Sequence, residues 1–150
     1  SLVGSEMCIR DSFSLGLDPG YRRLFVDYLR DYARSENKTV FLTSHIIQDM
    51  ERLIDDCIIM DYGSILIQQP IETLMKGLRK YTCTVPEGYQ PQLPVTCYHP
   101  AVIRQTLETY SFLPPSDVEG LLKENQVPFT GLQHENVGLE DAFIGLTGKY

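Results

Sequence analysis

The run Leu15-Gly16-Leu17-Asp18-Pro19 and the strand-like run Thr39-Val40-Phe41-Leu42-Thr43 constrain the fold more than any other part of the chain. An Asp is a good N-cap and Pro fits the first helical position, so the first run predicts the start of a helix. The second run is short, apolar and β-branched, which is typical of a strand covered on both faces, and Ser44 and His45 follow it. Together they predict an α/β sheet, in which loops at one sheet edge bind phosphate ligands.

Hydrophobic periodicity predicts that the helix runs from Gly20 to about Arg34. One of its faces is apolar and much of the other is charged. The apolar residues are Leu24, Tyr28, Leu29 and Tyr32, and the charged residues are Arg22, Arg23, Asp27, Arg30 and Asp31.

Two further helices and a hairpin are predicted before residue 80. An amphipathic helix is expected after His45, from the spacing of Ile46, Ile47, Met50, Leu53 and Ile54. Two apolar runs around Tyr62-Gly63-Ser64 then predict a β-hairpin that begins at Cys57. Pro70 should start a short helix, Ile71 to about Leu78.

The composition changes after Arg79, where prolines become frequent, and we place a soft domain boundary near residue 80. Beyond it, the patterns predict strands at 81–85, 95–98 and 127–133, and helices at 101–112, 115–125 and 138–146. No motif marks residues 80–137, so the segment 80–150 is interpreted as a small accessory α/β segment.

The first twelve residues show neither helical nor strand periodicity. Their sequence resembles translated read-through of a sequencing adapter at the end of an assembled gene fragment. Residues 1–12 are therefore expected to be a non-native or disordered leader, and the chain to be a piece of a longer protein. The alternative is an ordinary disordered N-terminus.

The net charge of −7 argues against a nucleic-acid partner, because such proteins neutralise phosphates with a basic surface. No run of 18 apolar residues predicts a membrane span. The four cysteines form no C-x-x-C pair, which fits reduced thiols better than a disulfide framework. Cys97 and His99 supply only two ligands, so no metal site is predicted.

Four motifs in order resemble those of the ATP-binding cassette (ABC) transporter ATPases. Residues 15–19 look like the D-loop, and Thr43-Ser44-His45 is similar to the switch His loop. The segment 57–65 resembles the hairpin that follows, and 138–148 resembles the "LEDxFxxLTG" ending of exporter-type cassettes. The resemblance implies an α/β fold: residues 13–79 as the C-terminal half of a P-loop-type nucleotide-binding domain, plus the accessory segment.

The resemblance assigns roles to individual residues. His45 would contact the γ-phosphate of ATP, next to Ser44. Asp18 would lie at the interface with a second ATPase subunit, although its role as a helix cap, worth about 1 kcal/mol, could alone explain it. Asp11 falls in register with the Walker B Asp that holds Mg²⁺, and Ser12 with the catalytic Glu.

The chain also departs from the family pattern. Ser12 replaces the Glu, Phe13 replaces the following Pro, and the residues before Asp11 are not the expected apolar strand. Asp11 is therefore either a coincidence of the leader or a remnant of a degenerate site, and on the sequence alone it is not counted as a metal ligand. The P-loop, the Q-loop and the LSGGQ signature are absent from these 150 residues. The chain is therefore expected to be inactive alone, whereas its parent would use ATP and Mg²⁺ to drive a membrane permease from the cytoplasmic face of the cell membrane. The alternative is a non-catalytic interaction or scaffold domain with a cassette-like core, which Ser12 favours.

Overall fold

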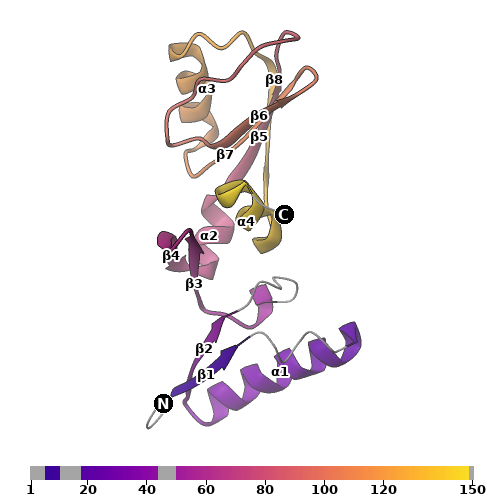
Figure 1. The fold of residues 1–150 in the computed structure, drawn as a ribbon, viewed down its shortest axis with the longest axis vertical. Coiled ribbons are helices and arrows are strands. Elements are labelled where there is room, and N and C mark those ends of the chain that lie inside the picture. Colours follow the sequence, from indigo (N-terminus) through magenta and orange to yellow (C-terminus); the bar gives the residue numbers. More distant parts are fainter. Residues whose placement is uncertain (1–5, 11–17, 44–49, 149–150) are drawn as a thin grey trace. The chain divides into compact units, whose positions relative to one another are not determined.

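The computed structural model describes residues 6–10, 18–43 and 50–148, and of residues 6–10 only the backbone (Figure 1). The chain divides into two compact units, Ser1–Ile54 and Asp55–Tyr150. The predicted boundary near residue 80 falls inside the second unit, so residues 55–79 pack with the accessory segment.

The first unit contains two parallel strands joined by a long helix. Strand β1 (Glu6–Arg10) pairs with β2 (Thr39–Thr43), and α1 (Pro19–Ser35) lies between them in sequence (Figure 1). Parallel strands need a crossover of a dozen or more residues, which α1 supplies. The short 3₁₀ turn η2 (Met50–Arg52) ends the unit. Of the amphipathic helix predicted at 46–54, residues 46–49 lie outside the described residues. The described remainder, residues 50–54, contains only the 3₁₀ turn η2 and no α-helix, so the prediction is wrong there.

Strand β1 was not expected from the sequence. Residues 6–10 show no strand periodicity, yet they pair with β2 along its whole length, from Glu6 opposite Thr39 to Arg10 opposite Thr43. Pairing with a distant strand overrides weak local preference. Whether residues 1–12 are native sequence stays a prediction.

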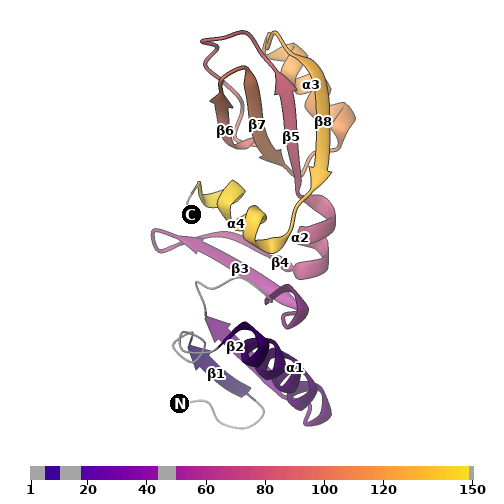
Figure 2. The same cartoon turned by 90° about the vertical axis from the view of Figure 1, so that its right-hand side faces the viewer.

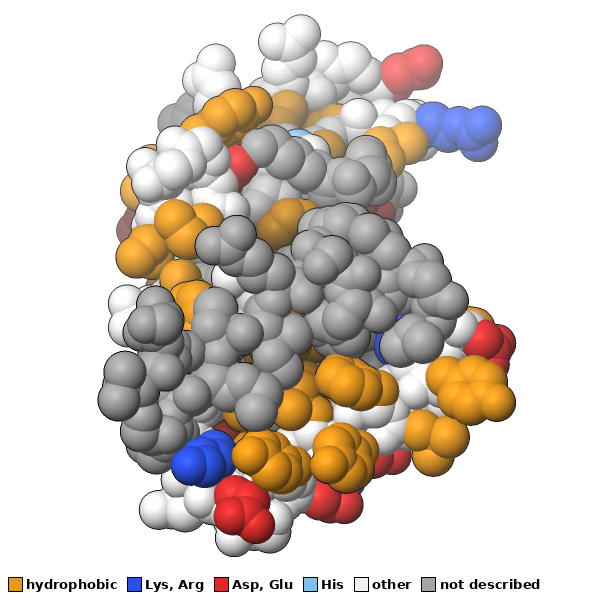
Figure 3. Space-filling view, turned by 60° about the horizontal axis from the view of Figure 1, so that its bottom comes forward, with side chains coloured by type: hydrophobic (Ala, Val, Ile, Leu, Met, Phe, Trp, Pro, Cys, Tyr) orange, Lys and Arg blue, Asp and Glu red, His pale blue; other side chains and the backbone are white. Residues whose placement is uncertain are grey.

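Helix α1 confirms the predicted helix but only part of its predicted apolar face. Val26 and Leu29 are its buried residues, whereas the side chains of Leu24 and Tyr28 are about two-thirds exposed. Strand β2 is also less covered than predicted, since Phe41 is 56% exposed and no residue of the strand is fully buried. Hydrophobic side chains accordingly gather on the surface in Figure 3.

The second unit begins with the predicted hairpin and helix. Strands β3 (Asp56–Asp61) and β4 (Ser64–Pro70) pair antiparallel, and α2 (Ile71–Gly77) follows. Both turn residues, Tyr62 and Gly63, have positive φ angles of 48° and 76°. Such angles are those of the tight turns whose twist suits a β-hairpin.

A four-stranded antiparallel sheet forms the rest of this unit (Figure 2). Its strands lie in the order β6-β7-β5-β8, and the crossover between β7 and β8 is the helix α3. Because β7 and β8 both run antiparallel to β5, they are parallel to each other with β5 between them, as in split β-α-β folds. The bounds are β5 (Arg79–Thr84), β6 (Tyr98–Ile103), β7 (Thr106–Ser111), α3 (Pro115–Glu124), β8 (Thr130–Asn136) and α4 (Leu139–Thr147).

The predicted helix at 101–112 is wrong, because these residues form the hairpin β6–β7. Val102 pairs with Leu107, and Arg104 in the turn has a φ of 58°. Val, Ile, Thr and Tyr side chains suit a half-buried sheet. Strand β7 also pairs with β5, which lies far away in sequence. The predicted strand at 95–98 is wrong except at Tyr98, where β6 begins.

A hydrophobic core lies between this sheet and α3. It consists of Tyr81, Cys83, Val85, Leu107, Val118, Leu122 and Val127. The Tyr81 hydroxyl donates a hydrogen bond to the Leu113 carbonyl at 2.6 Å, which satisfies its polar group at the edge of the core.

Helix α4 contacts β6 and β7 through two glycines. An added Cβ at Gly145 would lie 2.4 Å from the Tyr110 ring, and one at Gly148 would lie 2.7 Å from the His99 ring. Gly148 also has a φ of 71°, the left-handed conformation that favours Gly at the end of a helix. The "LTG" part of the C-terminal motif therefore has a packing role.

The substitution Gly145→Ala should destabilise the second unit. Because the Cβ would overlap the Cγ, Cδ1 and Cδ2 atoms of the Tyr110 ring, either the ring or α4 must move, at a cost of about 1–3 kcal/mol in the free energy of unfolding. Gly120→Ala in α3 is the matched control: an added Cβ there meets nothing within 4 Å. Urea unfolding followed by circular dichroism should show a loss for Gly145→Ala and none for Gly120→Ala; equal midpoints would contradict the close packing.

Candidate functional site

The carboxyl ends of β1 and β2 lie side by side, with Arg10 opposite Thr43. In open α/β sheets, ligands bind at this edge of neighbouring parallel strands. The residues that directly follow the two strands are Asp11 and Ser12 in one case, and Ser44 and His45 in the other. All four lie outside the described residues, but the strands that lead to them are neighbours.

Asp18 is the N-cap of α1 and is exposed. Its backbone carbonyl accepts a hydrogen bond from the Arg22 N–H at 2.9 Å, whereas its side chain makes no capping hydrogen bond. The cap expected from the sequence is therefore made by the backbone alone, and the carboxylate is not used to hold the helix end.

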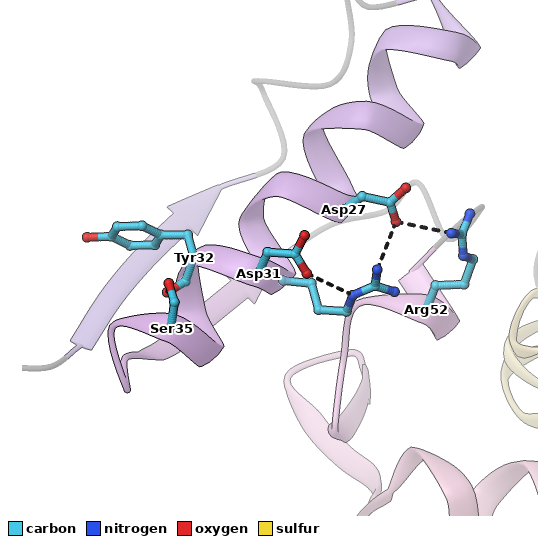
Figure 4. Close-up of polar contacts among 6 residues, drawn as sticks. Asp27, Asp31, Tyr32, Ser35 and Arg52 are labelled. Carbon is cyan, nitrogen blue, oxygen red and sulfur yellow. Dashed lines mark hydrogen bonds and ion pairs between the residues drawn. The ribbon is translucent and has the colours of Figure 1, made fainter.

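Three charged residues join α1 to η2, as Figure 4 shows. The Asp27 Oδ1 atom lies 3.1 Å from Nη2 of Arg52 and 3.4 Å from Nη2 of Arg30. The sequence shows Asp27 and Arg30 only as part of a charged helix face. Arg52 is missed because it lies 25 residues from its partner, and no local spacing signals the contact.

The resembling motifs of the second unit lie in the predicted elements. Residues 57–65 lie in the hairpin β3–β4, and residues 139–147 form α4. In α4, Leu139, Ala142 and Gly145 are buried, while Glu140 and Asp141 are exposed in its first turn. The acidic pair of this motif thus faces away from the packed side.

Cys97 and His99 supply only two candidate metal ligands. Among the described ranges, no group of three or more His, Cys, Asp or Glu residues could hold a metal ion. Burial raises the pKa of the Cys97 thiol above its usual value. The His99 ring lies against Gly148 instead.

Comparison with known proteins gives a consistent picture. The chain is 31% identical, over 96% of its length, to the Nod factor export ATP-binding protein I of Ralstonia nicotianae. It is 34% identical over 51% of its length to the bacitracin transport ATP-binding protein BcrA of Bacillus licheniformis. It is 33% identical over 52% of its length to the energy-coupling factor transporter ATP-binding protein EcfA2 of Staphylococcus aureus. No protein-family model matches the chain.

The chain belongs to the ABC transporter ATPase family. It spans about half the length of the curated relatives that it matches over nearly its whole length, covering 47% of the Ralstonia protein. It is thus a fragment of an ABC ATP-binding subunit. Since that match covers 96% of the chain, it includes most of the accessory segment, which is therefore shared with the relatives although residues 80–137 have no recognised motif.

The substitution Asp18→Ala should have little effect on the stability of the ABC fragment. Because the carboxylate makes no capping bond, the change in the free energy of unfolding should be less than about 0.5 kcal/mol, as for ordinary surface positions. Val26→Ala in the same helix removes fully buried methyl groups and should cost about 1–3 kcal/mol, which shows that the measurement reports on α1. A loss of about 1 kcal/mol or more for Asp18→Ala in urea titrations would mean that its side chain does cap the helix.

Proposed function

We propose that the intact protein is the ATP-hydrolysing subunit of a membrane exporter, with Asp18, Ser44 and His45 as its nucleotide-site residues. The observation that carries the proposal is the parallel pairing of β1 and β2, which leads two candidate loops to one sheet edge. The family membership and the order of the motifs support it.

The resemblance supplies the residue roles, and chain connectivity limits where these residues can lie. Successive Cα atoms are about 3.8 Å apart, so His45 can lie at most about 7.6 Å from Thr43, and Asp11 about 3.8 Å from Arg10. A neutral His can donate one hydrogen bond to a terminal phosphate if its other ring nitrogen is held. Mg²⁺ would neutralise phosphate charge, with the Asp11 carboxylate as its candidate ligand. Asp18, whose carboxylate makes no capping hydrogen bond at the helix start, would face the second ATPase subunit.

The donor set of this chain fits only part of a nucleotide site. No G-x-x-x-x-G-K-[ST] sequence occurs in the 150 residues, so they offer no backbone cradle for the phosphates. The grip on the triphosphate must then come from other segments of the subunit and from a second subunit. We propose a membrane permease as the further partner, with the protein bound at the inner face of the membrane. Among the described helices, none has the length and apolar character needed to cross a membrane.

Export is the proposed direction of transport. The relatives that match nearly the whole chain, including those of Ralstonia and of Rhizobium, are named Nod factor export proteins. Their match extends over the accessory segment, whereas the energy-coupling factor relative matches about half of the chain.

A non-catalytic scaffold is the second candidate. Strand β1 ends at Arg10, directly before Asp11, and this supports the register in which Ser12 takes the place of the catalytic Glu. A Ser hydroxyl cannot replace the Glu carboxylate as a general base. A parent with this residue could bind ATP yet turn it over slowly, and turnover by the intact subunit separates the two candidates.

His45→Ala in the intact subunit should leave ATP binding within about twofold and lower kcat by roughly 10²-fold, the scale of losing one positioned donor to developing charge. Turnover with the permease and equilibrium binding of ATP would be measured on the same preparations. His45→Gln is the conservative variant and should recover part of the rate. An unchanged kcat in His45→Ala would remove this residue from the mechanism.

The 150-residue chain by itself should not bind Mg-ATP with micromolar affinity, because it lacks the phosphate cradle. Calorimetric titration of the chain, beside the intact subunit as the positive control, tests this. Micromolar binding by the chain alone would show that the remaining residues grip the triphosphate.

A further inference from the structure

Asp27 is the centre of a charge network that spans two elements. Its Oδ1 atom accepts a hydrogen bond from Nη2 of Arg52 at 3.1 Å and lies 3.4 Å from Nη2 of Arg30. The Arg30 Nε atom in turn lies 3.8 Å from Oδ1 of Asp31 (Figure 4). One carboxylate therefore binds a guanidinium of its own helix and a guanidinium 25 residues further along the chain.

Each of the two elements that this network joins directly follows a segment with a candidate site residue, Asp18 before α1 and His45 before η2. Helix α1 begins after Asp18, and Asp27 lies nine residues further on, roughly 13 Å along the helix axis. The turn η2, with Arg52 at its end, follows the segment that contains His45. Met50 is buried at the start of η2, so this turn is held by an apolar contact and by the Asp27 ion pair.

The network suits positioning better than stabilisation. The side chains of Asp27 and Arg52 are 33% and 46% exposed, and such pairs contribute little to stability. These ion pairs define the relative geometry of α1 and η2. The planar guanidinium of Arg52 donates in fixed directions, and Arg30 also contacts the Asp27 carboxylate that accepts. The network contains two carboxylates and two guanidinium groups, so its charges balance.

We propose that Asp27 and Arg52 are positioning residues of the ATPase, which fix η2 on α1 and so align the segment that contains His45 with the helix that begins at Asp18. The inference rests on the proposed function, because it requires that His45 and Asp18 act at the nucleotide. Neither Asp27 nor Arg52 need touch ATP.

The test is a double-mutant cycle in the intact subunit with its permease. Asp27→Asn and Arg52→Gln should each lower kcat about three- to tenfold, as expected for a small displacement of reacting groups, while the KM for ATP stays within about twofold. The double variant should be no slower than either single variant, because both remove the same contact. Asp27→Glu, which keeps the charge, should recover part of kcat. Asp31→Asn is the matched control on the same helix, and it should leave kcat unchanged because its carboxylate does not reach Arg52.

The outcomes separate this inference from the proposed function. If the intact subunit does not hydrolyse ATP, or His45→Ala is as active as wild type, the proposed function fails. If the intact subunit hydrolyses ATP and His45→Ala lowers kcat, three results overturn the positioning role. They are single variants with wild-type kcat, additive losses in the double variant, or a loss in Asp31→Asn equal to that in Asp27→Asn. The unfolding midpoint of each variant, expected within a few degrees of wild type, shows that kcat is compared among folded proteins.

Discussion

The parallel pairing of β1 with β2 is the constraint on which the candidate site depends. Two parallel neighbours must be joined by a crossover, and here α1 is that crossover. Both strands therefore end at the same edge of the sheet, and the helix begins with Asp18. An antiparallel pair would have put the residues after β1 and those after β2 at opposite ends.

The second unit is held together by close packing of its helices on an antiparallel sheet rather than by the pairing of parallel strands. Its sheet is antiparallel and holds a core with α3, while α4 packs on β6 and β7 through glycines that leave room for two rings. Phe112, at the end of β7, also lies against Gly77 of α2, where an added Cβ would be 3.3 Å from its ring. These contacts join residues of the cassette part to the accessory part, which explains why the compact unit begins at Asp55 rather than near residue 80.

The sequence predicted the elements whose signals are local. Asp18 and Pro19 marked the start of α1, Tyr62 and Gly63 the hairpin turn, and Pro70 the start of α2. It did not predict β1, which pairs with a strand far away in sequence. It also did not predict the β6–β7 hairpin, whose turn has Arg104 at a positive φ in place of the Gly, Asn or Asp that usually marks such a turn. The contact between Asp27 and Arg52 was missed because the two residues are distant in sequence. The burial of Leu29 and Val26, with Leu24 exposed, shows that periodicity located the helix but only part of its packed face.

The exposed apolar side chains of the first unit fit a site assembled from several segments. Parallel strands are ordinarily covered on both faces, yet Phe41 of β2 and Leu24 and Tyr28 of α1 are exposed. The curated relatives are about twice as long as this chain, so they have ample sequence with which to cover such surfaces. A phosphate cradle is among the parts that the 150 residues do not supply. In the proposed function, covering these apolar faces and completing the nucleotide site would be one event, and the burial of apolar area would stabilise the arrangement in which His45 and Asp18 are proposed to act at the nucleotide.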